Sequence, residues 1–149
     1  MIILSKLADY GVIVASHLAL QPERQVNAAA VAAATRLPKA TVAKVLKALA
    51  HAGVVTGARG AAGGYRLARP AAEVSIAEVI AAIDGDIGMT HCTTHAPGCD
   101  RTDFCPTRPH WHHINHAVGE ALRSVSLAQM VAPAHAGRRY DFMQDTVSP

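Results

Sequence analysis

A glycine-rich run lies between two short β-prone segments in the middle of the chain. Residues 54–56 (VVT) precede the run GARGAAGG, and residues 65–67 (YRL) follow it, an order that predicts a β-hairpin. Of the 149 residues, 50% are hydrophobic but only 4% are aromatic. Because much of the apolar content is alanine, short packed helices are favoured over a β-sandwich. We therefore predict one mainly α-helical domain with a small β-hairpin.

Three helices are predicted ahead of the hairpin. Apolar residues recur at spacings of three and four from residue 4 to residue 20, which is the period of an α-helix. Asn27 can cap a second helix that ends near Thr35, and the third runs from Pro38 to Ala50 and stops at Gly53. Two short helices followed by a hairpin are typical of a winged helix-turn-helix, which places its second short helix in the major groove of DNA.

The third predicted helix has an apolar side and a basic side. On a helical wheel the apolar side is formed by Val42, Val45, Leu46 and Leu49. Lys39, Lys44 and Lys47 occupy the other side. From residue 36 to residue 69 the chain carries seven basic residues and no acidic one, whereas a solvated face without a partner would mix both signs. This pattern predicts a surface for double-stranded DNA, with Arg59 at the hairpin tip reaching a phosphate or the minor groove.

The second half of the sequence predicts a short helix, a polar loop and a long helix. Ser75 and Glu78 have the spacing of a capping box, and the polar run 88–109 predicts a loop. The helix that follows has an apolar stripe formed by Trp111, Ile114, Val118, Ala121 or Leu122, and Val125. A chain of this length has little left to cover such a stripe, so we predict that the helix pairs with its copy in a homodimer.

These patterns divide the chain into four predicted parts. Residues 1–87 form a winged helix-turn-helix DNA-binding domain, 88–109 a cysteine-bearing loop, 110–131 a dimerisation helix and 132–149 a flexible tail. No stretch has about 18 uncharged apolar residues, and no secretory signal precedes the first helix. We therefore expect a cytoplasmic protein that does not enter a membrane.

The three cysteines lie within one 14-residue window, at Cys92, Cys99 and Cys105. An odd, clustered set is a poor disulfide framework, and in a reducing compartment it indicates a metal. Thiolates suit zinc or iron–sulfur clusters, both of which normally take four protein ligands. Histidines near the cysteines could supply the fourth ligand in either case; they are His91, His95, His110, His112 and His113.

Several of these stretches together resemble the IscR/NsrR family of dimeric winged-helix repressors. They are the N-terminal LSKLADYG, the hairpin run ARGAAGGYRLARP, the following SIAEVIAAIDG and the three spaced cysteines. The stretch from Trp111 to Met130 is similar to the subgroup that regulates the SUF iron–sulfur assembly operon. The resemblance covers residues 1 to 131. It implies a homodimer with one iron–sulfur cluster per subunit, 2Fe–2S or 4Fe–4S, whose gain, loss or oxidation changes the affinity for DNA.

The resemblance also implies roles for individual residues. It makes cluster ligands of Cys92, Cys99 and Cys105. It places on DNA the face formed by Thr41, Lys44 and Lys47, together with Arg59 of the hairpin. Lys39, Gly60 and Arg66 complete our set of predicted DNA-binding residues. In the best-known branch a histidine stands three residues after the third cysteine, but this chain has Arg108 there. A guanidinium group stays protonated and cannot bind iron, so the resemblance leaves the fourth ligand open.

Two kinds of residue are candidates for the fourth ligand. Asp9 matches the position from which the nitric-oxide-sensing branch supplies a carboxylate of the partner subunit to a 4Fe–4S cluster. His110, His112 and His113 follow the third cysteine closely. An external thiol or a water molecule is the remaining alternative.

The function predicted from these features is a regulator that represses iron–sulfur assembly genes in response to cluster, iron or redox status. The alternatives are a nitric-oxide-sensing repressor of the same fold and a zinc-stabilised DNA-binding protein that senses nothing. No nucleophile, base and orienting residue form a recognisable constellation, so we expect neither an enzyme nor a small-molecule substrate.

Overall fold

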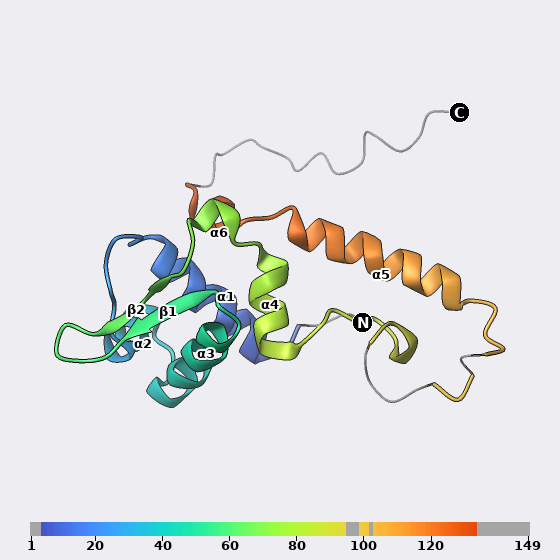
Figure 1. Ribbon diagram of the computed structural model, residues 1–149, viewed down its shortest axis with the longest axis horizontal. Coiled ribbons are helices and arrows are strands. Elements are labelled where there is room, and N and C mark those ends of the chain that lie inside the picture. Colours follow the sequence, from blue (N-terminus) through green and yellow to red (C-terminus); the bar gives the residue numbers. More distant parts are fainter. Residues whose placement is uncertain (1–3, 95–98, 102, 134–149) are drawn as a thin grey trace.

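Helices make up most of the described part of the chain, with one β-hairpin between α3 and α4 (Figure 1). The computed structural model describes residues 4–94, 99–101 and 103–133, so the predicted tail lies outside the described residues from residue 134 onward. The elements are α1 (Lys6–Ala19), α2 (Ala28–Thr35), α3 (Lys39–His51), β1 (Val55–Ala58), β2 (Gly64–Leu67), η1 (Ala71–Glu73), α4 (Ile76–Asp84), η2 (His91–Thr93), α5 (Arg108–Arg123) and α6 (Leu127–Val131). The predicted mainly helical fold with a two-stranded hairpin is confirmed.

Polar residues and a glycine set the helix ends where the sequence predicts them. The side chain of Asn27 accepts a hydrogen bond from the backbone N–H of Ala30 at 2.8 Å. Ser75 and Glu78 form the predicted capping box at the start of α4. Gly53 follows α3 with a φ of 73°, a left-handed conformation that glycine adopts without steric cost.

The hydrophobic core lies beneath α3, where α1, α3, α4 and the hairpin meet. The four predicted apolar residues of α3, which include Val45 and Leu49, are each 0% exposed. They belong to one cluster with Leu18 of α1 and Val79 of α4. Burial of this side fixes the rotation of α3 and leaves its basic side in solvent, which positions the candidate DNA surface.

The hairpin is fastened to the segment that leads into α2. Its strands pair antiparallel, with Val55 opposite Leu67. The backbone N–H of Tyr65 donates to the carbonyl of Val26 at 2.8 Å, and the N–H of Val26 donates back at 3.0 Å. A Cβ atom at Gly64 would lie 2.7 Å from the carbonyl carbon of Val26, so this close approach requires glycine.

The predicted long helix over residues 110–131 is two helices in the structure, which corrects the sequence prediction. α5 ends at Arg123, and a capping box that begins at Ser126 starts α6. Leu127 is 0% exposed in the core, and its N–H donates to the carbonyl of Val74 at 2.9 Å. The helix breaks because burying Leu127 requires the chain to turn back onto the helical domain, which comprises α1 to α4 and the hairpin.

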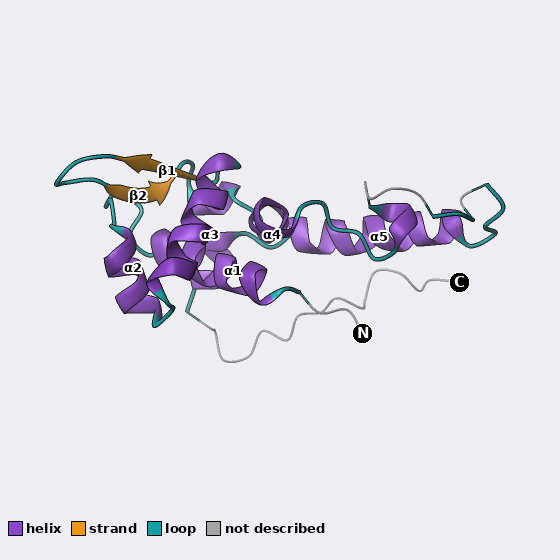
Figure 2. Cartoon of the chain, turned by 90° about the horizontal axis from the view of Figure 1, so that it is seen from below, coloured by secondary structure: helices purple, strands orange, loops and turns teal. Residues whose placement is uncertain are grey.

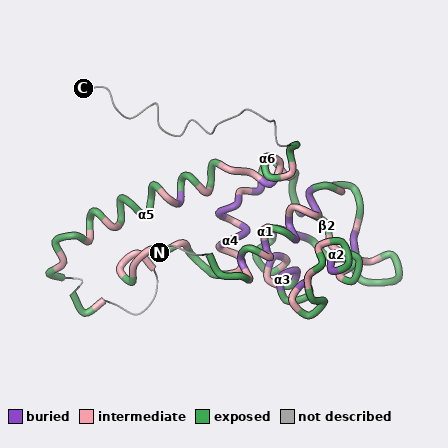
Figure 3. Tube along the Cα trace, turned by 180° about the vertical axis from the view of Figure 1, so that it is seen from behind, coloured by how far each residue is buried: buried purple, intermediate pink, exposed green. Residues whose placement is uncertain are grey.

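α5 projects from the helical domain as an arm, which Figures 1 and 2 show from two directions. Its one buried residue is Gly119, whereas α4 has four buried residues, a contrast that Figure 3 shows. The predicted apolar stripe is divided: Val118 and Leu122 are half-buried against the loop after α4, whereas Ile114 and Ala121 are exposed. In the part of the chain that the structure describes, no helix combines the length and apolarity needed to cross a membrane.

Candidate nucleic-acid interface and cysteine loop

The solvent side of α3 carries the lysines that the sequence assigns to DNA. Lys39, Lys44 and Lys47 are all exposed, whereas Thr41 is half-buried at the edge of this side. The turn into α3 passes through Arg36, whose φ of 57° makes it the one described non-glycine residue in the left-handed region. This tight turn sets α3 across α2 in the arrangement of a helix-turn-helix.

The hairpin adds a second set of basic residues beside α3. Arg59 and Gly60 are exposed in the loop between the strands, and Arg66 is exposed on β2. Arg69, also in the acid-free segment, is different because its guanidinium group forms an ion pair with Glu78. Arg59 and Arg66 are therefore the exposed cations of the hairpin, whereas Arg69 pairs with Glu78 in the first turn of α4.

One basic residue of this surface was missed in the sequence analysis. His51 ends α3 and is exposed, and together with Lys44 and Lys47 it lines a groove between α3 and α4. The signal that could have found it is the spacing: residues 44, 47 and 51 fall on one face of a helix.

The described cysteines lie near the start of the arm. Cys92 is in η2, which packs against α5, and Cys105 lies three residues ahead of α5. The Sγ atom of Cys92 lies 3.1 Å from Oγ1 of Thr90, and that of Cys105 lies 3.3 Å from Oγ1 of Thr107. Hydrogen bonds from the side chain and backbone of Thr107 lower the pKa of the Cys105 thiol below its ordinary value.

Cysteine chemistry fits a thiolate-ligated metal or cluster, although the ligands are not gathered. All three cysteines are half-exposed, and a lowered thiol pKa, as at Cys105, favours the ligating form. Within residues 4–94, 99–101 and 103–133, no three Cys, His, Asp or Glu side chains are close enough to hold a metal ion. His95 lies outside the described residues, and the other four candidate histidines, His91, His110, His112 and His113, are all exposed.

Asp9 lies on a different part of the molecule from the cysteine loop. It is exposed in the first turn of α1 and lines a groove between α1 and α6. The cysteine-bearing segments lie along the arm, toward the opposite end of the long axis from the hairpin (Figure 1). Within a single chain, the structure therefore does not bring Asp9 and Cys105 together.

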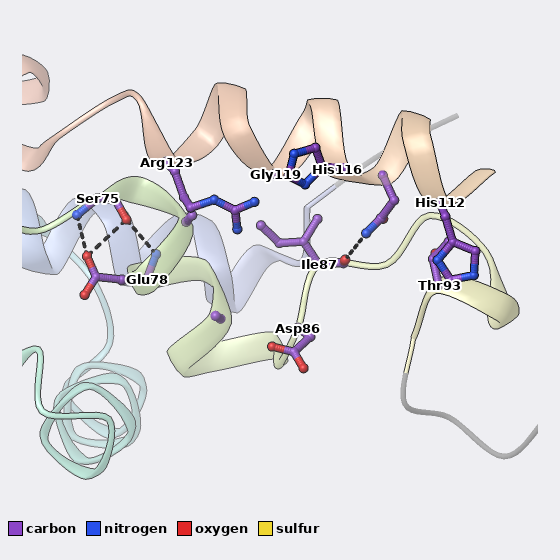
Figure 4. Close-up of a pocket in the computed structure, with 12 residues that line it drawn as sticks. Ser75, Glu78, Asp86, Ile87, Thr93, His112, His116, Gly119 and Arg123 are labelled. Atoms are coloured by element: carbon purple, nitrogen blue, oxygen red, sulfur yellow. Dashed lines mark hydrogen bonds between the residues drawn. The ribbon is translucent and has the colours of Figure 1, made fainter. Parts of the chain in front are cut away.

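A polar cleft separates α4 from the arm, and Figure 4 shows its lining. His112, His116 and Arg123 reach it from α5, and Asp86 lies on the opposite wall. Asn115 spans the cleft's edge: its amide nitrogen donates to the carbonyl of Ile87 at 3.0 Å, and its oxygen accepts the N–H of Met89 at 3.1 Å. Asn115 therefore fixes the start of the cysteine loop to the arm, a role that the sequence analysis did not identify.

Comparisons with known proteins agree with this architecture. The chain is 37% identical over 79 residues to the HTH-type transcriptional regulator IscR of Xenorhabdus nematophila, a match that covers 53% of this chain and 48% of that protein. Among solved structures, CymR (YrzC), the global cysteine regulator of B. subtilis, is 26% identical with a TM-score of 0.71 and coverage of 88% of this chain and 97% of that one. IscR of T. potens is 27% identical with a TM-score of 0.67, covering 87% and 86%.

The curated relative is thus matched over about half of its length, while the structural matches extend through the arm. The family model for Rrf2, described as an iron-dependent transcriptional regulator, matches residues 4–133. That range takes in the helix-turn-helix, the hairpin, the cysteine loop and both C-terminal helices. The sequence analysis predicted that the protein is not an enzyme, and the match to a family of transcriptional regulators agrees with that prediction. The chain belongs to the Rrf2 family of iron-dependent transcriptional regulators.

Proposed function

We propose that this protein is a dimeric DNA-binding repressor of iron–sulfur assembly genes of the SUF type, controlled by an iron–sulfur cluster on the cysteine loop. The observation that carries the proposal is that a basic surface and a cysteine-bearing segment lie on two parts of the chain that pack against each other. The basic side of α3 and the hairpin lies on the helical domain, and the cysteines lie along the arm that α4 and Asn115 hold to that domain. The Rrf2 match and the similarity to IscR proteins support this reading.

DNA binding would use α3 in the major groove and the hairpin beside it. Lys44 and Lys47 point away from the buried side of α3, so they can reach bases or phosphates, and Lys39 lies at the end of α3 that enters the groove. Thr41 would contribute from the edge of this side. Arg59, with Gly60 and Arg66, would reach the phosphates or the minor groove.

The cluster would be held by Cys92, Cys99 and Cys105. Bound there, an iron–sulfur cluster supplies redox and ligand-exchange chemistry that responds to oxidants, iron supply or nitric oxide. The protein contributes thiols, and the hydrogen bonds of Thr107 favour the thiolate form of Cys105. Without the cluster, the three cysteines of residues 92–105 would no longer bind a common group. The way in which the loop supports α5 would then change.

Dimerisation would cover the outward side of the arm. Ile114, Ala117 and Ala121 are exposed at spacings of three and four, so they form one line along α5. The small alanines permit close approach of a second helix, and Ile114 supplies the apolar side chain to bury. A second copy of α5 related by a two-fold axis would match this line to itself.

The same dimer offers a route to the fourth ligand. Because Asp9 and Cys105 of one chain lie in different parts of the fold, a carboxylate ligand would have to come from the partner subunit. His110, in contrast, is in the first turn of α5, close in sequence to Cys105 of its own chain. A carboxylate holds iron weakly and would give a labile cluster, which suits a sensor.

The decisive experiment is anaerobic purification followed by iron, sulfide and zinc analysis and a visible spectrum, with DNA binding measured before and after cluster removal. The proposal predicts iron and sulfide in equal amounts, no zinc and a change of affinity on cluster loss. Cys99→Ser should bind DNA as the cluster-free protein does. Zinc without sulfide, and equal DNA binding by both proteins, would instead establish the zinc-stabilised alternative. A response to nitric oxide but not to iron supply would favour the nitric-oxide-sensing branch.

A mixing experiment separates the two candidates for the fourth ligand. Asp9→Ala and Cys105→Ser variants each lose a ligand if Asp9 serves the cluster. In mixed dimers one site recovers an intact set of thiols together with the Asp9 of the other chain. Random exchange makes about half of the dimers mixed, and each mixed dimer has one intact site of two, so about a quarter of all sites should recover the cluster absorbance. A stable, normal cluster in Asp9→Ala, with loss in His110→Ala, would place the fourth ligand within the chain.

A further inference from the structure

The groove between α3 and α4 has a basic rim and a floor of small side chains. Lys44, Lys47 and His51 form the rim. The floor and walls are alanines of both helices: Ala48, Ala50, Ala52, Ala81 and Ala82. No carboxylate of the described residues lines it, and small side chains let a large ligand approach the backbone of both helices.

Among the described residues, no acidic side chain faces His51 in the groove. α4 contributes only alanines to the groove, and its Glu78 is paired with Arg69 while its Asp84 accepts a hydrogen bond from Ser5. β1 carries no titratable residue, and α1 packs against the buried side of α3. Of the described residues, the titratable groups that line the groove are therefore the rim side chains alone, Lys44, Lys47 and His51.

The position of His51 in the last turn of α3 gives its charge a specific effect. Carbonyl groups at a helix C-terminus carry partial negative charge, which repels an anion when the end is uncompensated. An imidazolium at this position reverses that repulsion, and histidine is the side chain whose charge changes between about pH 5 and pH 8. His51 is also the one histidine between residues 36 and 69.

We infer that this groove binds the sugar–phosphate backbone of duplex DNA, and that His51 makes this binding depend on pH. The inference rests on the proposed DNA-binding function and adds a contact site to it. Phosphates would lie along the rim formed by Lys44, Lys47 and His51, which spans about 10 Å of helix. Protonation of His51 would add one phosphate contact per subunit, so DNA affinity would rise as the pH falls from 8 to 6.

The test measures binding of the full-length protein to a fluorescently labelled 30-base-pair duplex of mixed sequence, by anisotropy at pH 6 and pH 8 over a series of salt concentrations. The variants are His51→Gln, which cannot become charged, and His51→Arg, which is always charged. His17→Gln, on α1 and outside the groove, is the matched control. Circular dichroism of each variant checks that α3 is folded.

Wild type and His17→Gln should bind roughly fivefold more tightly at pH 6 than at pH 8, with a salt slope steeper by about one for each added phosphate contact. His51→Gln should lose this gain, and His51→Arg should bind at pH 8 as wild type does at pH 6. Equal pH dependence in wild type and His51→Gln, with salt-dependent binding in both, would overturn the inference and leave DNA binding intact. Absence of salt-dependent binding by wild type would overturn both proposals.

Discussion

The helical domain and the arm differ in what holds them together. Apart from Leu127, every buried hydrophobic residue in the described part of the chain lies at or before Ile80. The arm buries one glycine along α5, and its neighbour, the cysteine loop, keeps its thiols half-exposed. A segment without a core of its own must obtain stability from a partner or a ligand. The proposed second copy and cluster would supply the stability that the arm lacks, whereas the helical domain has a hydrophobic core of its own.

The largest expected effect is the loss of a core side chain from the helical domain. Leu46→Ala removes a leucine that is 0% exposed in α3 and should lower the free energy of unfolding by about 3 kcal/mol. Ile114→Ala is the matched control on the arm, where the side chain is 40% exposed, and should cost about 0.5 kcal/mol or less. Urea unfolding at low protein concentration measures both. Equal losses would show that the arm has a core of its own.

A charge on the arm should affect assembly and leave the fold intact. Ile114→Glu places a carboxylate on the line that we propose to be covered by the second copy, and burying it unpaired should weaken dimerisation at least tenfold, or by roughly 1.4 kcal/mol. Sedimentation equilibrium gives the dissociation constant. Leu20→Glu, at a position 62% exposed beyond α1, is the control and should dimerise normally. A monomeric Leu20→Glu protein beside a dimeric Ile114→Glu protein would move the interface to α1.

The fold of the helical domain was predictable because its signals are local. The period of apolar residues in α3, the capping residue Asn27 and the glycine after α3 each act within one or two turns, and all appear where expected. The break after α5 was not predicted, because it depends on burying Leu127 against residues about 50 positions earlier, such as Val74. The sequence pattern continues across that break with helical spacing, so periodicity alone could not reveal it.

The candidate site was predictable in its residue types and less so in its arrangement. Clustered thiols and an acid-free basic segment can be recognised from chemistry, and the exposed lysines of α3 agree with that interpretation. Asn115 and His51 were missed because each acquires its meaning from an element that only the fold brings near: the loop after α4 for Asn115, and α4 itself for His51. Arg69 belongs to the predicted basic segment, yet its pairing with Glu78 shows that not every cation there is available.

A smaller effect is expected at the junction of the two regions. Asn115→Ala removes both hydrogen bonds that fix the loop after α4 to α5, at a local cost of about 1 kcal/mol. Hydrogen exchange of the Met89 amide should therefore become several-fold faster. His116→Ala, one position further along α5, makes neither bond and should leave that amide unchanged. Unaltered exchange in Asn115→Ala would mean that the loop is held to the arm by other contacts.

The smallest expected difference compares one ion pair in each region. Burial raises the pKa of Glu78, but hydrogen bonds from Ser75 and the Arg69 guanidinium outweigh it, so the pKa lies below its ordinary value. A carboxyl whose pKa is lower in the folded state stabilises the fold above its unfolded pKa, and that contribution is lost as the pH falls through the folded pKa. Glu78→Ala should therefore cost about 1 kcal/mol at pH 7, mainly through the lost capping box. The difference from wild type should shrink between about pH 5 and pH 3.

Glu120, which pairs with Arg123 at 2.9 Å on the arm, is the matched comparison. The side chains of Glu120 and Arg123 are both more than half exposed. An exposed pair three residues apart on a helix contributes little to the free energy of unfolding, about 0.5 kcal/mol or less. Glu120→Ala should thus unfold almost as wild type does at every pH. Glu78→Gln separates the charge from the capping hydrogen bond, because glutamine keeps that bond and removes only the charge. Its loss of unfolding free energy should fall between those of the two alanine variants, and added salt should reduce it. If Glu120→Ala were the more costly substitution, the arm's exposed surface would contribute more to folding than its burial indicates.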